Sequence, residues 1–241
     1  YANPEGGLEV AEPALDLPLA ESSTRAALQK FDKESNTWTL DENPALLTGK
    51  SAFISATWDT MGWILFREGK LAEAQSYLNA AWVNSEGPDN AQHLAEVALA
   101  RGDKRAAMAY FEYALAGLAT YNGMGIRNPP GPEELKVQAS VDELTKDGIK
   151  STVGPAKDPT KETQAIRTIP LGPAHGLSGT VEYRILLHDG KVVKSNPTGS
   201  SRMANADELL THARFPHYFP AGSQASLVRL GYINCHSGTC E

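Results

Sequence analysis

The feature that most constrains the fold of this chain is an internal repeat. Residues 55–87 and 88–120 align with each other at an offset of 33 residues. The matching positions are Trp58, Met61, Gly62, Leu65, Gly69, Ala74, Leu78 and Ala81 in the first unit, and Ala91, Leu94, Ala95, Ala98, Gly102, Ala107, Phe111 and Ala114 in the second. A repeat of this length is typical of proteins that stack one helical hairpin on the next.

The residue types at these positions suit helical hairpins. Small side chains at positions 62, 74, 81, 95, 107 and 114 let paired helices approach closely, whereas bulky residues such as Trp58 and Phe111 fill the space between hairpins. Gly69 and Gly102 each follow an amphipathic stretch, at the place where a left-handed residue commonly ends a helix. Pro88 is compatible with the first turn of the next helix. The pattern therefore predicts two stacked helical hairpins over residues 55–120.

The first unit resembles the tetratricopeptide repeat. Trp58, Met61 and Gly62 have the spacing of its W-x2-L-G signature, although the second unit lacks the leading aromatic residue. Two hairpins rarely bury a stable core by themselves, so we expect capping helices over residues 19–34 and 133–147. The resemblance implies that the array binds a protein partner on its concave face.

A longer stretch resembles the terminal repeats of large bacterial envelope proteins, in which a transglutaminase-like domain precedes tetratricopeptide repeats. The likeness is carried by residues 58–64, by Ala80-Ala81-Trp82 and by His93-Leu94, and it covers residues 45–241. The upstream domains are not in this sequence, so transglutaminase-like activity is not expected of it. Residues 1–7 contain no Met, basic segment or apolar core, which predicts a processed chain.

The C-terminal part of the sequence has the composition of a separate module. Residues 148–163 contain two prolines, two glycines and few apolar side chains, which predicts a linker. Residues 179–196 alternate as a β-hairpin that turns at Asp189-Gly190. A helix over 203–213 and a strand over 225–234 complete a β-β-α-β order. We expect this module to lie apart from the repeats.

The same module resembles the C-terminal domain of TonB-like proteins. The resemblance is carried by Gly179-Thr-Val-Glu-Tyr, Asp189-Gly-Lys-Val-Val, Leu209-Leu210 and Phe219-Pro-Ala-Gly222. In that family the domain binds partners by adding a strand to a sheet edge, which implies a second binding surface here. The tail that begins at Cys235 has no counterpart in that family, so energy transduction is not implied.

The two cysteines of the chain, Cys235 and Cys240, flank a short segment that contains Gly238. This spacing permits a disulfide, because glycine relieves the backbone of a small loop. Two free thiols are an alternative, and so is a metal site with His236, although two cysteines and one histidine fall short of four zinc ligands. A disulfide would indicate an extracytoplasmic compartment, either the periplasm or the wider cell envelope.

Charge and hydropathy exclude two classes of partner. The net charge is −7, and acidic residues predominate over the first 156 residues without any cluster of Lys and Arg. Such a surface cannot neutralise phosphates, so nucleic acid is not an expected partner. No apolar run approaches the roughly 18–20 residues of a membrane span, so a direct span is not expected.

The sequence lacks the common catalytic motifs, which include the Gly-rich phosphate loop, G-x-S-x-G and H-E-x-x-H. Five of the six histidines lie in the C-terminal third, but the spacing of His212 and His217 does not match a zinc-binding helix. Adjacent residues such as Cys235 and His236 point to opposite faces of a strand, which disfavours a nucleophile–base pair. We therefore expect no catalytic residue, no bound metal and no cofactor.

Two other groups of residues are better explained by a structural role than by a role in ligand binding or catalysis. Trp58, Trp63 and Trp82 could stack on a ligand, but their helical spacing favours core packing. Acidic side chains in the repeats, such as Glu73 and Asp89, are typical of a solvated helix face. The repeat residues and the cysteine pair are therefore interpreted as structural.

Together these features predict an α+β protein in which a tetratricopeptide-type array of α-hairpins precedes a small β-β-α-β domain. The expected boundaries are 1–147 for the helical domain, 148–163 for the linker and 164–241 for the TonB-like domain. The expected function is non-enzymatic binding or scaffolding of a protein partner in a bacterial cell-envelope assembly. Alternatives are a regulatory C-terminal part of a larger transglutaminase-like or TonB-like protein, and a metal-dependent enzyme.

Overall fold

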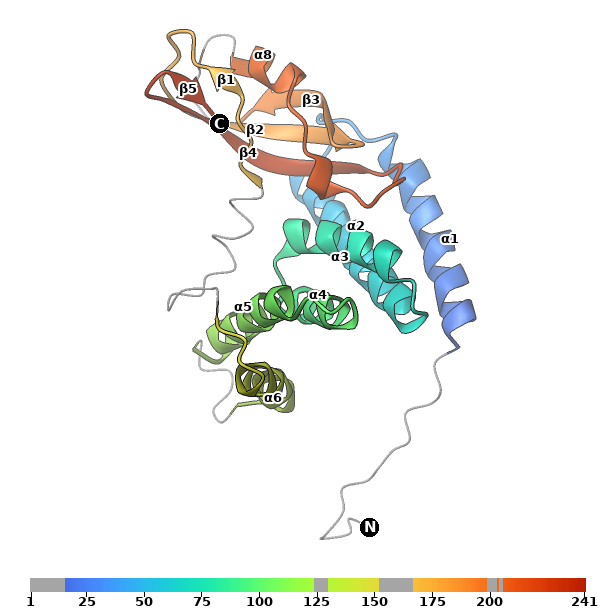
Figure 1. Cartoon of the computed structure of the whole chain (residues 1–241). Helices are drawn as coiled ribbons and strands as arrows, with labels where there is room; N and C mark the ends of the chain where they lie inside the picture. The colour runs from blue at the N-terminus through green and yellow to red at the C-terminus, as the bar shows by residue number, and fades with distance from the viewer. Residues whose placement is uncertain (1–15, 124–129, 152–166, 199–202, 204–205) are drawn as a thin grey trace.

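The computed structural model describes residues 16–123, 130–151, 167–198, 203 and 206–241. Its helical part follows the sequence in simple order (Figure 1). The helices are α1 (Leu17–Ser35), α2 (Pro44–Arg67), α3 (Leu71–Ser85), α4 (Pro88–Ala100), α5 (Lys104–Gly123) and α6 (Pro132–Lys146). Helices α2 and α3 pack together, as do α4 and α5, so the two helical hairpins expected over residues 55–120 are confirmed. Membership of the tetratricopeptide family stays a prediction.

The repeat residues explain why these hairpins form. At Gly62 an added Cβ would lie 2.6 Å from Cγ of Leu78, so α2 and α3 approach as closely as the missing side chain allows. Gly69 and Gly102 have φ values of +78° and +79° in the turns that follow α2 and α4. Pro88 begins α4, as expected.

The other signature residues lie in the core. Those that are almost fully buried are Trp58, Met61, Leu65, Ala74, Leu78, Ala81, Ala91, Leu94, Ala95, Ala107, Phe111 and Ala114. Helices stand at both expected capping positions, because α1 packs on α2 and α6 packs on α5. The hairpin pair therefore continues into a further helix at each end.

The rest of the described chain forms a five-stranded antiparallel sheet with the order β1-β5-β4-β2-β3. The strands are β1 (Gly172–Pro173), β2 (Gly179–His188), β3 (Lys191–Pro197), β4 (Ser226–His236) and β5 (Thr239–Cys240). Between β3 and β4 lie the short helices α8 (Ala206–Thr211) and η1 (Pro216–Tyr218). The β2–β3 hairpin turns at Asp189-Gly190, as predicted, where both residues have positive φ. The mixed α+β class is confirmed.

Two details of the expected β-β-α-β order were wrong. Strands β1 and β5 were missed because each is two residues long and leaves no alternating pattern in the sequence. Helix α8 is shorter than the expected helix over 203–213. The predicted linker over 148–163 lies mostly outside the described residues, and the division into domains stays a prediction.

The expectation that the sheet lies apart from the repeats was wrong. Strand β4 packs against α2 and α1 (Figure 1). Its backbone N–H groups at Ser226 and Val228 donate hydrogen bonds to the hydroxyl oxygens of Ser35, at 2.8 Å, and Ser51, at 2.9 Å. Both acceptor serines are buried. Since β5 covers only the far end of β4, the two helices cover the edge that would otherwise be open.

Candidate functional site

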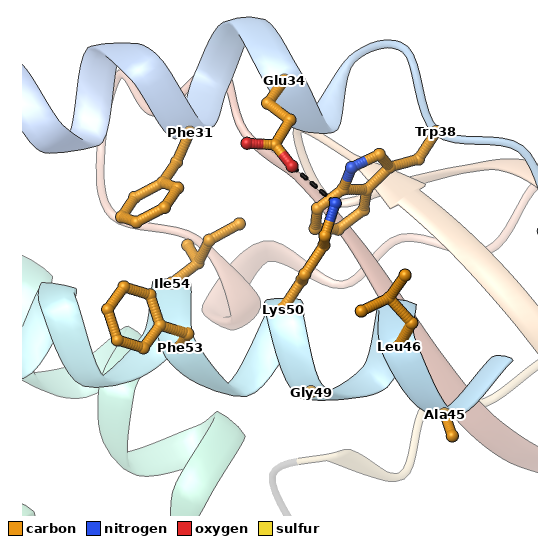
Figure 2. A pocket seen from close by; sticks show the side chains of 9 residues that line it. All are labelled: Phe31, Glu34, Trp38, Ala45, Leu46, Gly49, Lys50, Phe53 and Ile54. Atoms are coloured by element: carbon orange, nitrogen blue, oxygen red, sulfur yellow. Dashed lines mark hydrogen bonds and ion pairs between the residues drawn. The ribbon is translucent and has the colours of Figure 1, made fainter. Parts of the chain in front are cut away.

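The clearest candidate site is a groove between α1 and the first half of α2, with a volume of about 340 Å³. Figure 2 shows its lining: Phe31, Glu34, Trp38, Ala45, Leu46, Gly49, Lys50, Phe53 and Ile54. The first two come from α1 and the last six from α2, while Trp38 belongs to the connection between the helices. We call this feature the α1–α2 groove.

Local sequence explains why the groove forms. Helix α2 begins at Pro44, and the side chain of Asn43 caps it by accepting hydrogen bonds from the backbone of Ala45 and Leu46. In the connection before this cap, Trp38 and Leu40 are buried and anchor the turn. The turn therefore holds the start of α2 at a fixed place beside α1.

One part of the groove is apolar and open to solvent. The rings of Phe31 and Phe53 meet edge to face, with centroids 5.4 Å apart. Phe53 is nevertheless 62% exposed and Leu46 is 52% exposed. Leu46, Lys50 and Phe53 follow helical spacing, so they share one side of α2 (Figure 2). A partner that covered this side would remove two large apolar side chains from water.

The other part of the groove is polar. The Lys50 ammonium donates to a carboxylate oxygen of Glu34 at 2.6 Å and lies 5.7 Å from the ring centroid of Trp38. The hydrogen bond from Lys50 lowers the pKa of Glu34, with their charge attraction acting in the same direction. The indole Nε1 of Trp38 is buried and has no acceptor among the described residues. An unpaired buried donor destabilises the unbound protein.

The lining of the groove combines a few polar groups with a larger apolar surface. It contains one carboxylate, one ammonium and one indole beside apolar side chains. These groups can bind an apolar side chain and orient nearby polar atoms. A concave apolar surface with a few polar groups is the usual composition of a ligand-binding site.

None of the signature residues predicted from the repeat lines this groove. They lie in the core or in turns, which fits the structural role expected of them. Among the tryptophans, Trp58 and Trp82 are buried. Trp63 is only partly buried and stacks on His93 at 4.3 Å, and His93 is hydrogen bonded to Asp59 at 3.0 Å.

Sequence reasoning missed the groove for a simple reason. Phe31 lies within residues 19–34, the stretch expected to form the first capping helix, where an apolar side chain is ordinarily expected to pack in the core. Leu46 and Phe53 lie before the first repeat unit, where no internal comparison was possible. Their apolar character was visible in the sequence, but exposure depends on what packs against them.

Cys235 and Cys240 form a disulfide, which links β4 to β5 at positions that also pair in the sheet. This finding favours the disulfide over the two alternatives left open by the sequence. Among the described residues, no group of three or more His, Cys, Asp and Glu side chains could hold a metal ion.

Comparisons with protein-family models, with curated proteins and with solved structures gave no match. The tetratricopeptide, transglutaminase-like and TonB-like resemblances therefore rest on the residues quoted for them. Within the described part of the chain, no helix is long and apolar enough to cross a membrane.

Proposed function

We propose that this protein is a non-enzymatic binding subunit that holds a protein partner, and that the α1–α2 groove receives a bulky apolar side chain of that partner. The observation that carries the proposal is the exposure of Phe53 and Leu46 at the rim of a 340 Å³ groove. Large apolar side chains gathered around a concave surface are typical of interaction sites.

The polar part of the groove supports a peptide ligand in particular. An apolar side chain would pack between Phe31 and Phe53, and the main chain beside it would face Glu34 and Lys50. A peptide presents both N–H donors and carbonyl acceptors, so it can pair with a carboxylate and an ammonium at once. A purely apolar ligand would leave these two charges without new partners.

The sheet edge predicted as a second binding surface is less suitable. Strand β3 is the outer strand on one side of the sheet, and it carries Lys191 and Lys194. Lysines on an edge strand oppose the addition of another strand. The groove is therefore the primary site in this proposal.

The proposal also includes the finer expectations drawn from sequence. The paired helices with capping helices at both ends support a tetratricopeptide-type array, and the disulfide between Cys235 and Cys240 supports work outside the cytoplasm, in a bacterial envelope. The alternative, a regulatory C-terminal part of a larger envelope protein, is compatible with the same groove, because a regulatory part of this kind would also bind a protein partner.

The test is a selection of peptides from a random displayed library, followed by affinity measurements on two variants. Phe53→Ala should weaken the selected peptides by about 30-fold, which corresponds to about 2 kcal/mol for the loss of an aromatic anchor. Leu135→Ala is the matched control, because Leu135 on α6 is 58% exposed and lies outside the groove.

Two outcomes would contradict the proposal. Selected peptides could bind Phe53→Ala as tightly as the unaltered protein, which would place the binding site elsewhere. A library could also yield no binding peptide, which would remove the case for peptide recognition. Loss of affinity in both variants would indicate a general loss of structure, and circular dichroism of each variant identifies that case.

A further inference from the structure

A second cavity lies on the sheet, away from the α1–α2 groove. It has a volume of about 460 Å³ and is lined by β2 and β4, by residues 167–171, by the segment from α8 to η1 and by Glu241. Its apolar wall includes Tyr183, Ile185, Leu187, Leu210, Phe215 and Tyr218. We call it the sheet cavity. A cavity of this size is within the range of small-molecule sites.

The unusual feature of the sheet cavity is the arginine in its wall. Arg229 lies on β4 directly opposite Ile185 of β2, in the middle of the apolar face. It is partly buried, and none of the hydrogen bonds or ion pairs among the described residues involves its guanidinium group. Arginine has five N–H donors, and buried arginines are normally paired.

A second arginine lies at the same cavity but is already engaged. Arg167 donates from Nε to the carbonyl oxygen of Val83 at 2.5 Å and forms an ion pair with Glu86. Because Arg167 is itself a cation, it cannot act as a counter-ion for Arg229. Its own positive charge is paired with the carboxylate of Glu86.

The electrostatics agree with this geometry. Burial is the main cause that lowers the pKa of Arg229, and the charge of Arg167 lowers it further, while Tyr218 and Glu86 act in the opposite direction. Burial also raises the pKa of the Tyr218 hydroxyl, so this neighbour stays neutral and supplies no negative charge at ordinary pH. The unbound protein thus keeps a positive charge in an apolar wall, and an anion placed beside it would offset the cost of that burial.

We propose that the sheet cavity binds a small organic anion, with its carboxylate or phosphate on the guanidinium of Arg229 and its apolar body against Ile185 and the surrounding aromatic rings. A planar guanidinium donates two parallel hydrogen bonds to either anion. The cavity continues along β4 from Arg229 to Asn234, which spans roughly 17 Å at the usual rise of a strand. The ligand is therefore elongated. This site is independent of the proposed peptide groove.

The test is calorimetric titration of the whole protein with octanoate and octyl phosphate as probes, and with octanol as their uncharged counterpart. Both anions should bind, and octanol should bind at least about tenfold more weakly because it cannot form a charge-assisted pair. Arg229→Met keeps a long apolar side chain and removes the charge, so it should weaken the anions by about tenfold or more. Arg105→Met, at an exposed position of α5, should leave both affinities unchanged.

A second variant tests the cavity without changing the charge. Gly231 also lines the cavity, and a Cβ added there would lie 3.1 Å from Cδ1 of Ile185, so Gly231→Val should fill space that the ligand needs. It should abolish binding even though Arg229 is intact. Equal binding of octanoate and octanol, unchanged binding in both cavity variants, or no binding of either anion would overturn the proposal. Preference for one anion over the other would identify the head group.

Discussion

At the scale of single residues, two glycines of the same helix have opposite roles. Gly62 faces α3, and a methyl group there would meet Leu78 at 2.6 Å. Gly49 lies in the first half of α2, and a Cβ added there would meet nothing within 4 Å. Close packing of α2 on α3 therefore requires glycine at position 62, whereas nothing nearby requires glycine at position 49.

This difference predicts opposite effects of the same substitution. Gly62→Ala should destabilise the protein by about 1–3 kcal/mol, because the added methyl group forces α2 and α3 apart. Gly49→Ala should stabilise it by roughly 0.5–1 kcal/mol, since alanine is the better helix former. Urea unfolding of both variants measures the two changes. Equal effects would show that the close approach of α2 and α3 does not explain the glycine at position 62.

At the scale of elements, α1 is held against the turn between α2 and α3 by a network of charges. Glu21 of α1 accepts hydrogen bonds from Lys70 at 2.8 Å and from Arg25 at 2.6 Å. Lys70 also pairs with Glu68, and Arg25 with Glu73. The hydrogen bond from Lys70, followed by that from Arg25, lowers the pKa of Glu21 from 4.5 to about 2. The network joins the capping helix to the first hairpin.

This pKa shift predicts a pH dependence of stability. Because the pKa of Glu21 is lower in the folded state, its contribution is fully present above about pH 4.5 and is lost as the pH falls toward about 2. Glu21→Gln should therefore be less stable than the unaltered protein near pH 7, by a modest amount that salt reduces. The difference should disappear near pH 2.

Thermal unfolding at a series of pH values measures this effect. Glu133→Gln, at an exposed position of α6, controls for the loss of one negative charge. A difference between Glu21→Gln and the unaltered protein that stays constant down to pH 2 would show that the carboxylate charge of Glu21 does not stabilise α1.

At the scale of the whole molecule, the contact between sheet and helices is made partly through polar groups. Ser51 of α2 is 2% exposed, and its hydroxyl accepts a hydrogen bond from the backbone N–H of Val228 while donating one to the carbonyl of Leu47. Ser35 accepts from Ser226 in the same way. Each serine satisfies a strand N–H that no other strand of the described residues reaches, so the helices and the sheet pack directly against each other.

Removal of one such hydroxyl should therefore affect global stability. Ser51→Ala leaves the N–H of Val228 buried without an acceptor, which should destabilise the protein by about 1–3 kcal/mol. Ser22→Ala removes an exposed hydroxyl of α1 and should change stability by less than about 0.5 kcal/mol. Unfolding followed separately by tryptophan fluorescence and by circular dichroism measures both. A Ser51→Ala protein with unchanged stability would show that the sheet does not depend on this bond.

Features that depend on neighbouring residues in the chain could be predicted from the sequence. The helical hairpins follow from the spacing of small and large side chains, the ends of α2 and α4 from Gly69 and Gly102, and the β2–β3 turn from Asp189-Gly190. Each is governed by backbone geometry or by periodicity, which short segments contain in full. The bonded cysteine pair belongs to the same class, because its partners lie five residues apart.

Only the tertiary structure decided how these elements meet. The packing of α1 and α2 against β4 depends on hydrogen bonds between residues far apart in the chain, such as Ser35 and Ser226, which are 191 residues apart. The exposure of Phe53, and the absence of a partner for Arg229 among the described residues, depend likewise on which side chains pack beside them. Burial and pairing are properties of three-dimensional neighbours, so no local pattern in the sequence could reveal the α1–α2 groove or the sheet cavity.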